Sequence, residues 1–216
     1  MDAVKENMLR AIRLIGIVAI PSTFFFLFFG GIIGQTIFFG IPTSDATFIG
    51  NLLSVFALAL LPLGLNTVFI RTLNAFENTR FQAFSNLIIN AIAALISFFA
   101  YLFLPIELKT LGIAAAFTLS YLIGQFVTFG TLKVYIGELS HRPYLTLYLK
   151  LALISATILG LLGIIGTLLP ASRLGNTLYL FVVLIVTSLG YITITKRMGV
   201  SEVSEVVRIV TRRSQR

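Results

Sequence analysis

Charged residues in this chain stand in a few clusters, separated by six long intervals that contain none. The intervals cover residues 14–44, 46–70, 81–106, 110–132, 151–172 and 174–195. A helix that crosses a bilayer needs about 20 such residues, and it satisfies its own backbone hydrogen bonds where water is absent. A membrane β-barrel would instead show alternating segments of roughly ten residues. The sequence therefore predicts an all-α, polytopic membrane helix bundle with six transmembrane helices.

Turn-forming residues between the intervals indicate where the spans end, as at Gly40–Asp45, Pro105–Lys109 and Pro170–Gly175. We expect a transmembrane domain over residues 12–196, with spans near 12–34, 48–70, 82–104, 110–132, 148–169 and 175–195. Residues 1–11 are predicted to be a cytoplasmic N-terminal segment, and residues 197–216 a basic cytoplasmic tail. Valines at helical spacing in this tail fit either an amphipathic helix on the membrane surface or a solvated basic tail.

The basic residues are distributed unequally between the two sides of the predicted bundle. Of the 16 Lys and Arg residues, only Lys109 and Arg173 fall on one side, and the other 14 fall on the opposite side. Lys and Arg concentrate in cytoplasmic loops of membrane proteins. This asymmetry predicts a multi-pass protein of the cytoplasmic (inner) membrane with both termini in the cytoplasm.

The composition argues against a soluble enzyme. Hydrophobic residues make up 57% of the chain and charged residues 11%, whereas soluble domains carry about 25% charged residues. All acidic residues fall in loops or tails, so no catalytic carboxylate pair is expected inside the membrane. The chain has no cysteine and only His141, so we expect no metal site and no cofactor. Basic residues stand at segment ends rather than on a face interleaved with aromatics, which argues against nucleic acid as a partner.

Uncharged polar residues within the predicted spans are the remaining candidates for a functional site. Their amides need partners in a medium of low dielectric constant, so they should face other helices or a wet cavity. Asn86 and Asn90 are four residues apart and therefore lie on one helix face. Two interpretations stay open, hydrogen bonds that join helices and the lining of a solute path. The residues are Gln35, Asn51, Asn66, Asn86, Asn90 and Gln125.

Two spans contain a proline, Pro21 in the first and Pro62 in the second. Proline within a helix removes a backbone hydrogen bond and can kink the helix. Kinks occur both in transporters and in static bundles.

The stretch LPLGLNTVFIRTLNAFENTRFQAFSNLIINAIAAL resembles the lipid II flippase family called MurJ or MviN. In that family a helix bearing a basic residue runs into a short polar turn and then into an Asn-containing helix. The positions that match are Arg71, Asn74, Ala75, Phe76, Asn78, Thr79, Arg80 and Asn90, whereas Glu77-Asn78 and Phe81-Gln82 depart from the family's Gly-Asp and Thr-Pro. The flanking segments IRLIGIVAIPSTFFFLFFGGIIGQTIFFG and LGIAAAFTLSYLIGQFV are also similar, so the resemblance covers most of residues 8–138.

The resemblance implies the C-terminal lobe of a transporter of the MOP superfamily, with a fold like that of the MATE extruders. These proteins have two lobes that rock around a central cavity. A single lobe offers one wall of such a cavity, so the resemblance implies either a separate chain that carries the N-terminal helices or a truncated product or fragment.

The activity implied is translocation of lipid II, the lipid-linked peptidoglycan precursor, in cell-wall biogenesis. Arg71 and Arg80 would attract phosphate at the cytoplasmic entrance, or they would simply anchor helix ends at the membrane surface. Four amides, those of Asn66, Asn86, Asn90 and Gln125, would line or brace the cavity. The alternatives are an exporter of other lipid-linked oligosaccharides, such as O-antigen or capsule units, and a noncatalytic membrane scaffold subunit or inactive fragment.

Overall fold

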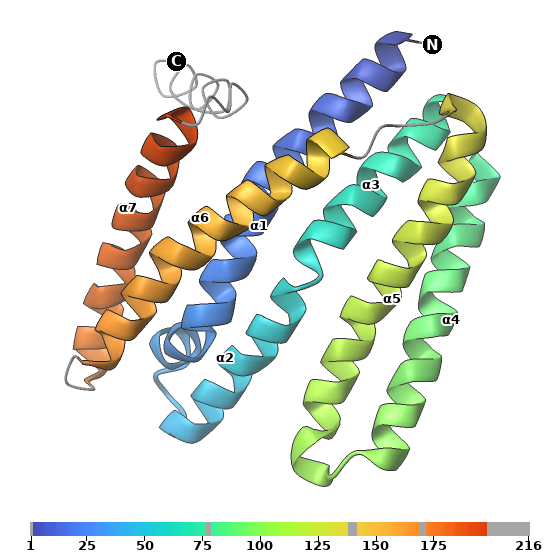
Figure 1. Ribbon diagram of the computed structural model, residues 1–216. Coiled ribbons are helices and arrows are strands. Elements are labelled where there is room, and N and C mark those ends of the chain that lie inside the picture. Colours follow the sequence, from blue (N-terminus) through green and yellow to red (C-terminus); the bar gives the residue numbers. More distant parts are fainter. Residues whose placement is uncertain (1, 77–78, 138–141, 169–171, 198–216) are drawn as a thin grey trace.

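The computed structural model describes residues 2–76, 79–137, 142–168 and 172–197 (Figure 1). Within these residues the chain forms seven α-helices and no strand. The helices are α1 (Asp2–Ile37), α2 (Thr43–Ala57), α3 (Leu60–Ala75), α4 (Thr79–Phe103), α5 (Ile106–Ile136), α6 (Arg142–Thr167) and α7 (Arg173–Arg197). The prediction of an all-α membrane bundle is confirmed.

Five of the helices are long and apolar enough to cross a membrane, and α2 with α3 forms a sixth candidate span if the bent pair counts as one. Helix α1 is longer than the first predicted span and already begins at Asp2. Helix α2 begins at Thr43, within the predicted turn, directly after Pro42. Of the predicted basic tail, an amphipathic surface helix or a solvated segment, only Arg197 is described, and residues 198–216 lie outside the described residues.

The second predicted span differs from a continuous helix, because it breaks at Leu58 and Ala59 and bends by 41°. Pro62 lies in the first turn of α3, where its missing N–H leaves the carbonyl of Leu58 without the usual donor. The amides of Leu58 and Ala59 bond instead to the carbonyls three residues earlier, at 3.3 and 3.0 Å. The proline therefore ends one helix and starts the next.

Carbonyl oxygens at the end of α2 are satisfied by hydroxyl groups from neighbouring helices. Thr23 of α1 donates to the carbonyl of Ala57 at 3.0 Å. Thr118 of α5 donates to the carbonyl of Val55 at 3.1 Å. A bilayer offers no water to these carbonyl groups. The two threonines therefore lower the free-energy cost of breaking the helix inside the membrane.

Pro21 does not break its helix, since α1 continues through it as one helix. A proline at this position leaves the carbonyl of Ile17 without its usual amide donor. The hydroxyl of Tyr191, on α7, donates to that carbonyl at 2.9 Å. A side chain from the last helix thus completes the hydrogen bonding of the first.

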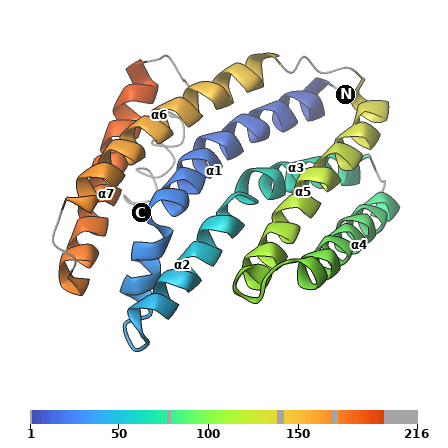
Figure 2. The same cartoon turned by 60° about the horizontal axis from the view of Figure 1, so that its bottom comes forward.

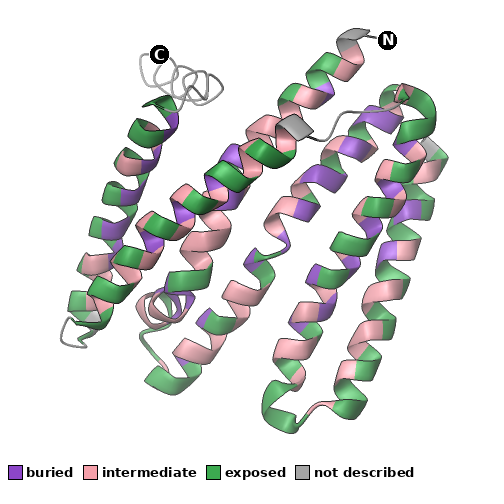
Figure 3. Ribbon diagram, viewed as in Figure 1, coloured by how far each residue is buried: buried purple, intermediate pink, exposed green. Residues whose placement is uncertain are grey.

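Helix α1 is the central element of the bundle and packs against α2, α3, α6 and α7 (Figures 1 and 2). Three clusters of buried apolar side chains follow one another along it. They are centred on Met8 and Ile12, on Ile17 and Ile20, and on Phe29 and Ile33. Helices α4 and α7 stand at opposite edges, and most of their outer surfaces are exposed (Figure 3).

The closest helix contact joins α1 and α2 through glycines. A Cβ atom added at Gly34 would collide with the carbonyl oxygen of Ala46 and stand 2.8 Å from the backbone nitrogen of Gly50. One added at Gly50 would collide with the carbonyl oxygen of Gly30. The two backbones therefore touch directly, as small residues allow in membrane bundles.

We expect Gly34→Ala to destabilise the bundle by about 2 kcal/mol, because the new methyl group meets backbone that cannot move aside as a flexible side chain can. Gly130→Ala is the matched control, since Gly130 is also helical and has no atom within 4 Å of an added Cβ. The control should be neutral or slightly stabilising, because alanine favours helix more than glycine does. Thermal unfolding in detergent measures both variants. Equal melting temperatures for the two would contradict the tight α1–α2 contact.

Candidate functional site

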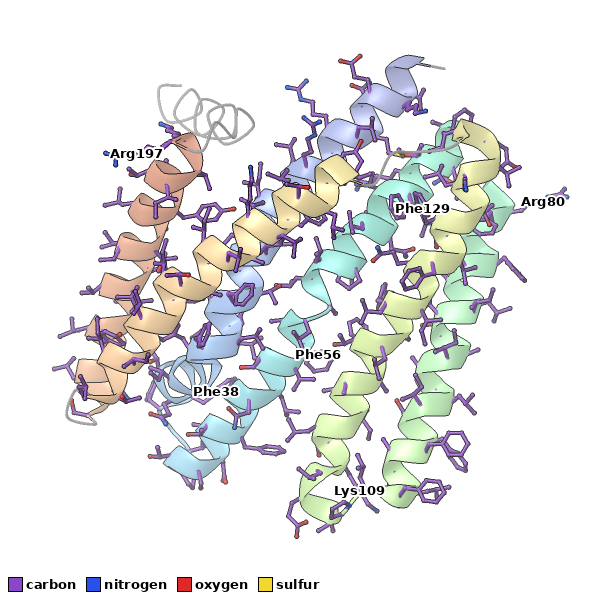
Figure 4. All side chains as sticks on the ribbon, in the orientation of Figure 1. Phe38, Phe56, Arg80, Lys109, Phe129 and Arg197 are labelled. Atoms are coloured by element: carbon purple, nitrogen blue, oxygen red, sulfur yellow. The ribbon has the colours of Figure 1, made fainter. Side chains whose placement is uncertain are left out.

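A cavity of about 360 Å³ opens between helices α1, α3, α5 and α6. Its lining is almost entirely apolar and rich in aromatic side chains. The lining residues are Ile12, Leu65, Phe69, Gln125, Phe126, Phe129, Tyr144, Leu145 and Tyr148. Figure 4 shows Phe129 of this set on α5, in the half of the bundle that holds the N-terminal end of α1.

Tyr148 fixes the contact between α6 and α1 at one wall of the cavity. Its hydroxyl donates to the carbonyl of Ile12 at 2.7 Å. Its ring lies against Gly16, where any Cβ atom would overlap the ring. The guanidinium of Arg13 stands 5.9 Å from the ring centroid of the neighbouring Tyr144, a cation–π contact. A half-buried basic residue therefore lies beside one aromatic residue of the cavity wall.

Gln125 is the only amide among the cavity-lining residues and is half-buried. It brings a donor and an acceptor into an otherwise apolar surface. Ligand sites combine apolar walls with few polar groups in this way. Gln125 was predicted from the sequence, and the structure places it in this cavity.

Asn66 lies instead in a buried polar contact among α3, α4 and α5. The hydroxyl of Thr128 is 2.8 Å from the Oδ1 atom of Asn66 and 2.8 Å from the hydroxyl of Ser85. All three residues are at most 3% exposed. Thr128 has one hydroxyl hydrogen, which it donates either to Asn66 or to the carbonyl of Gly124, so Ser85 can donate to Thr128. This contact is of the kind that joins helices.

The two arginines predicted to attract phosphate and the two amides of α4 lie on exposed surfaces and are not gathered with Asn66 and Gln125. Arg71, on the last turns of α3, is exposed, and so is Arg80 at the start of α4. Figure 4 shows Arg80 extending away from the edge of the bundle. Asn86 and Asn90 share an exposed face of α4. The structure thus separates the predicted residues into a buried contact, a cavity wall, an outer helix face and two helix ends.

Sequence reasoning missed Thr128, Ser85 and Tyr148. Ser and Thr are too frequent in membrane helices to stand out singly. A signal was nevertheless present in α5, where small residues recur every fourth position and all are buried: Ala116, Ser120, Gly124 and Thr128. Such a repeat marks the face on which another helix packs closely, and here Ile89 of α4 lies over Gly124.

Comparison with known protein families shows to which family this chain belongs. The sequence model of the family described as lipid II flippase MurJ matches residues 1–191. The chain belongs to the MurJ family. Neither a curated protein nor a solved structure matches it. Members of the MurJ family are transporters rather than enzymes, so membership agrees with a multi-pass membrane protein and with lipid II as the substrate of the family.

The Thr128 contact leads to a test of how the MurJ bundle holds α4. Thr128→Val keeps the volume but removes the hydroxyl, and we expect it to destabilise the bundle by about 1 kcal/mol. Thr131→Val is the control, because Thr131 lies on the same helix and bonds only to the carbonyl of Val127 on that helix. Thermal unfolding in detergent should show a loss for the first variant alone. A loss of the same size in both would mean that the buried contact contributes nothing specific.

Proposed function

We propose that this chain acts as the C-terminal lobe of a flippase that moves lipid II outward across the cytoplasmic membrane. The observation that carries the proposal is the match of residues 1–191 to the MurJ family model, which includes α1 to α6 and most of α7. The candidate spans agree with a polytopic transporter. Transport of this kind needs no covalent chemistry, because the two lobes only have to expose the site to each side in turn.

The second lobe is proposed to come from a separate chain that carries the family's N-terminal helices. In this arrangement the apolar cavity beside Gln125 would take part of the lipid's hydrocarbon. Arg71 and Arg80 would attract the pyrophosphate near the entrance, since guanidinium groups bind phosphate strongly. Asn66 is proposed to brace α3 against α5, and Asn86 and Asn90 to act from the exposed face of α4.

Both termini are proposed to lie in the cytoplasm. The basic residues Lys5, Arg10 and Lys196 stand where α1 begins and α7 ends, and these two ends lie at the same end of the bundle (Figure 1). Lys109, in the first turn of α5, lies at the opposite end (Figure 4). The proposed orientation places the richer basic end inside, as the positive-inside rule requires.

Complementation tests the proposed transport. The cell's own flippase is depleted, this chain is expressed with and without a chain that carries the N-terminal helices of a MurJ protein, and lipid II exposed on the outer face is measured. We expect exposure to be restored when both chains are present. If neither condition restores it while the chain is present in the membrane, the flippase assignment fails and a scaffold role is favoured.

The same assay tests the basic residues. Arg71→Gln with Arg80→Gln should lower outward exposure of lipid II several-fold, because each change removes a charge that attracts phosphate. Lys150→Gln is the control, an exposed basic residue near the start of α6. If the double variant and the control transport equally well at equal protein levels, the two arginines serve only to anchor helix ends.

A further inference from the structure

Gln35 joins three helices at the end of the bundle opposite the N-terminus. It lies in the last turn of α1, and its side chain contacts residues of both α2 and α7. Its Nε2 atom donates to the hydroxyl oxygen of Thr47 on α2 at 2.8 Å. Its Oε1 atom accepts from the Nδ2 atom of Asn176 on α7 at 3.1 Å. One side chain of α1 therefore bridges α2 and α7.

The direction of each hydrogen bond in this contact is set by its neighbours. Thr47 has one hydroxyl hydrogen, which it donates to the carbonyl of Thr43 in its own helix at 2.7 Å. Its oxygen must therefore accept from Gln35, which turns the amide nitrogen of Gln35 toward α2 and its oxygen toward α7. Asn176 supplies the donor for that oxygen. The side chains form a continuous chain of hydrogen bonds from α7 to the backbone of α2, in which each bond polarises the next.

Helix α7 is an edge helix that packs against α1 and α6 and exposes its outer side (Figures 2 and 3). One hydrogen bond ties it to α1 near its start, between Asn176 and Gln35. Another ties it to α1 near its end, where the hydroxyl of Tyr191 donates to the carbonyl of Ile17. At 1.5 Å per residue, these two points lie about 22 Å apart along α7. Polar contacts therefore fasten this helix to α1 at two distant places.

Apolar packing between these two places holds the helix less firmly than it would in water. Leu180 and Val183 of α7 belong to a buried cluster with Phe29 and Ile33 of α1. Lipid tails are as apolar as these side chains, so separating them in a bilayer lacks the hydrophobic cost that it has in water. Thr187 is buried nearby on α7, but its hydroxyl makes no hydrogen bond among the residues that the structure describes. The end bonds thus carry a large share of the attachment.

The two end bonds differ in their access to water. Tyr191 is 7% exposed and satisfies a carbonyl that Pro21 leaves without an amide donor, so breaking its bond would leave a polar group unpaired inside the membrane. Asn176 lies in the first turn of α7, and both Asn176 and Gln35 are half-buried. At such helix ends, water can replace a hydrogen bond that breaks. The bond between Asn176 and Gln35 is therefore the easier of the two to open.

We propose that the Asn176–Gln35 bond is a releasable clasp, and that the start of α7 swings away from α1 while Tyr191 stays in place as the pivot. Opening exposes the apolar cluster around Phe29 to lipid, and closure restores the clasp. The movement costs little beyond the clasp itself, because lipid tails replace the apolar contacts that are lost. Segments with few fixed contacts open in this way while the rest of a structure stays folded.

Distances between spin labels test the motion. The chain has no cysteine, so pairs of labelled cysteines can be introduced at exposed positions of the full chain in phosphatidylethanolamine–phosphatidylglycerol vesicles. Leu178→Cys with Ile113→Cys reports the clasp end of α7 against α5, and Ile194→Cys with Val134→Cys reports the pivot end. We expect the first pair to show a main distance and a minor longer one, and the second pair to show one distance.

Loss of the clasp should favour the open form. Asn176→Leu and Gln35→Leu remove the same bond, so each should raise the population of the longer distance about fivefold, equivalent to roughly 1 kcal/mol. The double variant should add nothing further, because the bond is already absent. Thr193→Val is the matched control, since Thr193 lies on α7 and its hydroxyl bonds to the carbonyl of Leu189 in the same helix. It should leave both distances unchanged.

Three results would overturn the proposal. Equal distance distributions in wild type and the clasp variants, or an equal shift in the control, would mean that the clasp does not hold α7. Lengthening of both label pairs together would mean that α7 detaches as a whole instead of pivoting at Tyr191. Additive effects of the two leucine changes would mean that Asn176 and Gln35 do not act through one contact. The measurement involves no transport, so its outcome is separate from that of the flippase proposal.

Discussion

Satisfaction of backbone carbonyls inside the membrane is the constraint on which this bundle depends. Each proline in a span removes one amide donor, and hydrocarbon supplies no replacement. Around the break before Pro62, Thr23 and Thr118 donate to carbonyls of α2. Beside Pro21, Tyr191 donates to the carbonyl of Ile17. At both places a side chain of another helix supplies a hydrogen bond to the backbone.

These contacts also determine which helices are neighbours. Tyr148 and Tyr191 come from α6 and α7, and both hydroxyls bond to carbonyls of α1. Glycines permit the remaining close approach, between α1 and α2. Helix α1 is thus held on one side by tyrosines and on another by direct backbone contact. The cavity lies beside this helix and is lined by residues of α1, α3, α5 and α6.

The number of spans could be predicted from the sequence because the cost of burying charge is local and acts on every residue. The break in the second span could not be placed in advance. Pro62 breaks the helix and Pro21 does not, although both are prolines within apolar stretches. At Pro21 the hydroxyl of Tyr191 donates to the freed carbonyl of Ile17, whereas before Pro62 the amides of Leu58 and Ala59 bond to carbonyls three residues earlier.

In the candidate site, too, some properties could be predicted from the sequence and others could not. The need of Asn66 and Gln125 for polar surroundings could be inferred from residue type, but not that Asn66 would meet Thr128 from another helix while Gln125 would line a cavity. Asn86 and Asn90 were correctly expected to share a face, because helical spacing is a property of one element. Whether that face is covered depends on what packs against α4, which no local pattern encodes.

By itself, the sequence determined the all-α membrane class, because the length of each hydrophobic stretch can be read directly from it. It also determined membership of the MurJ family, because the motifs shared with known members are local to the sequence. Only the tertiary structure decided which polar groups are buried, where α2 ends and α3 begins, and which helix edge is left open. Those outcomes depend on side chains far apart in sequence meeting in space, and the free energy of such contacts belongs to the assembled bundle rather than to any segment of it.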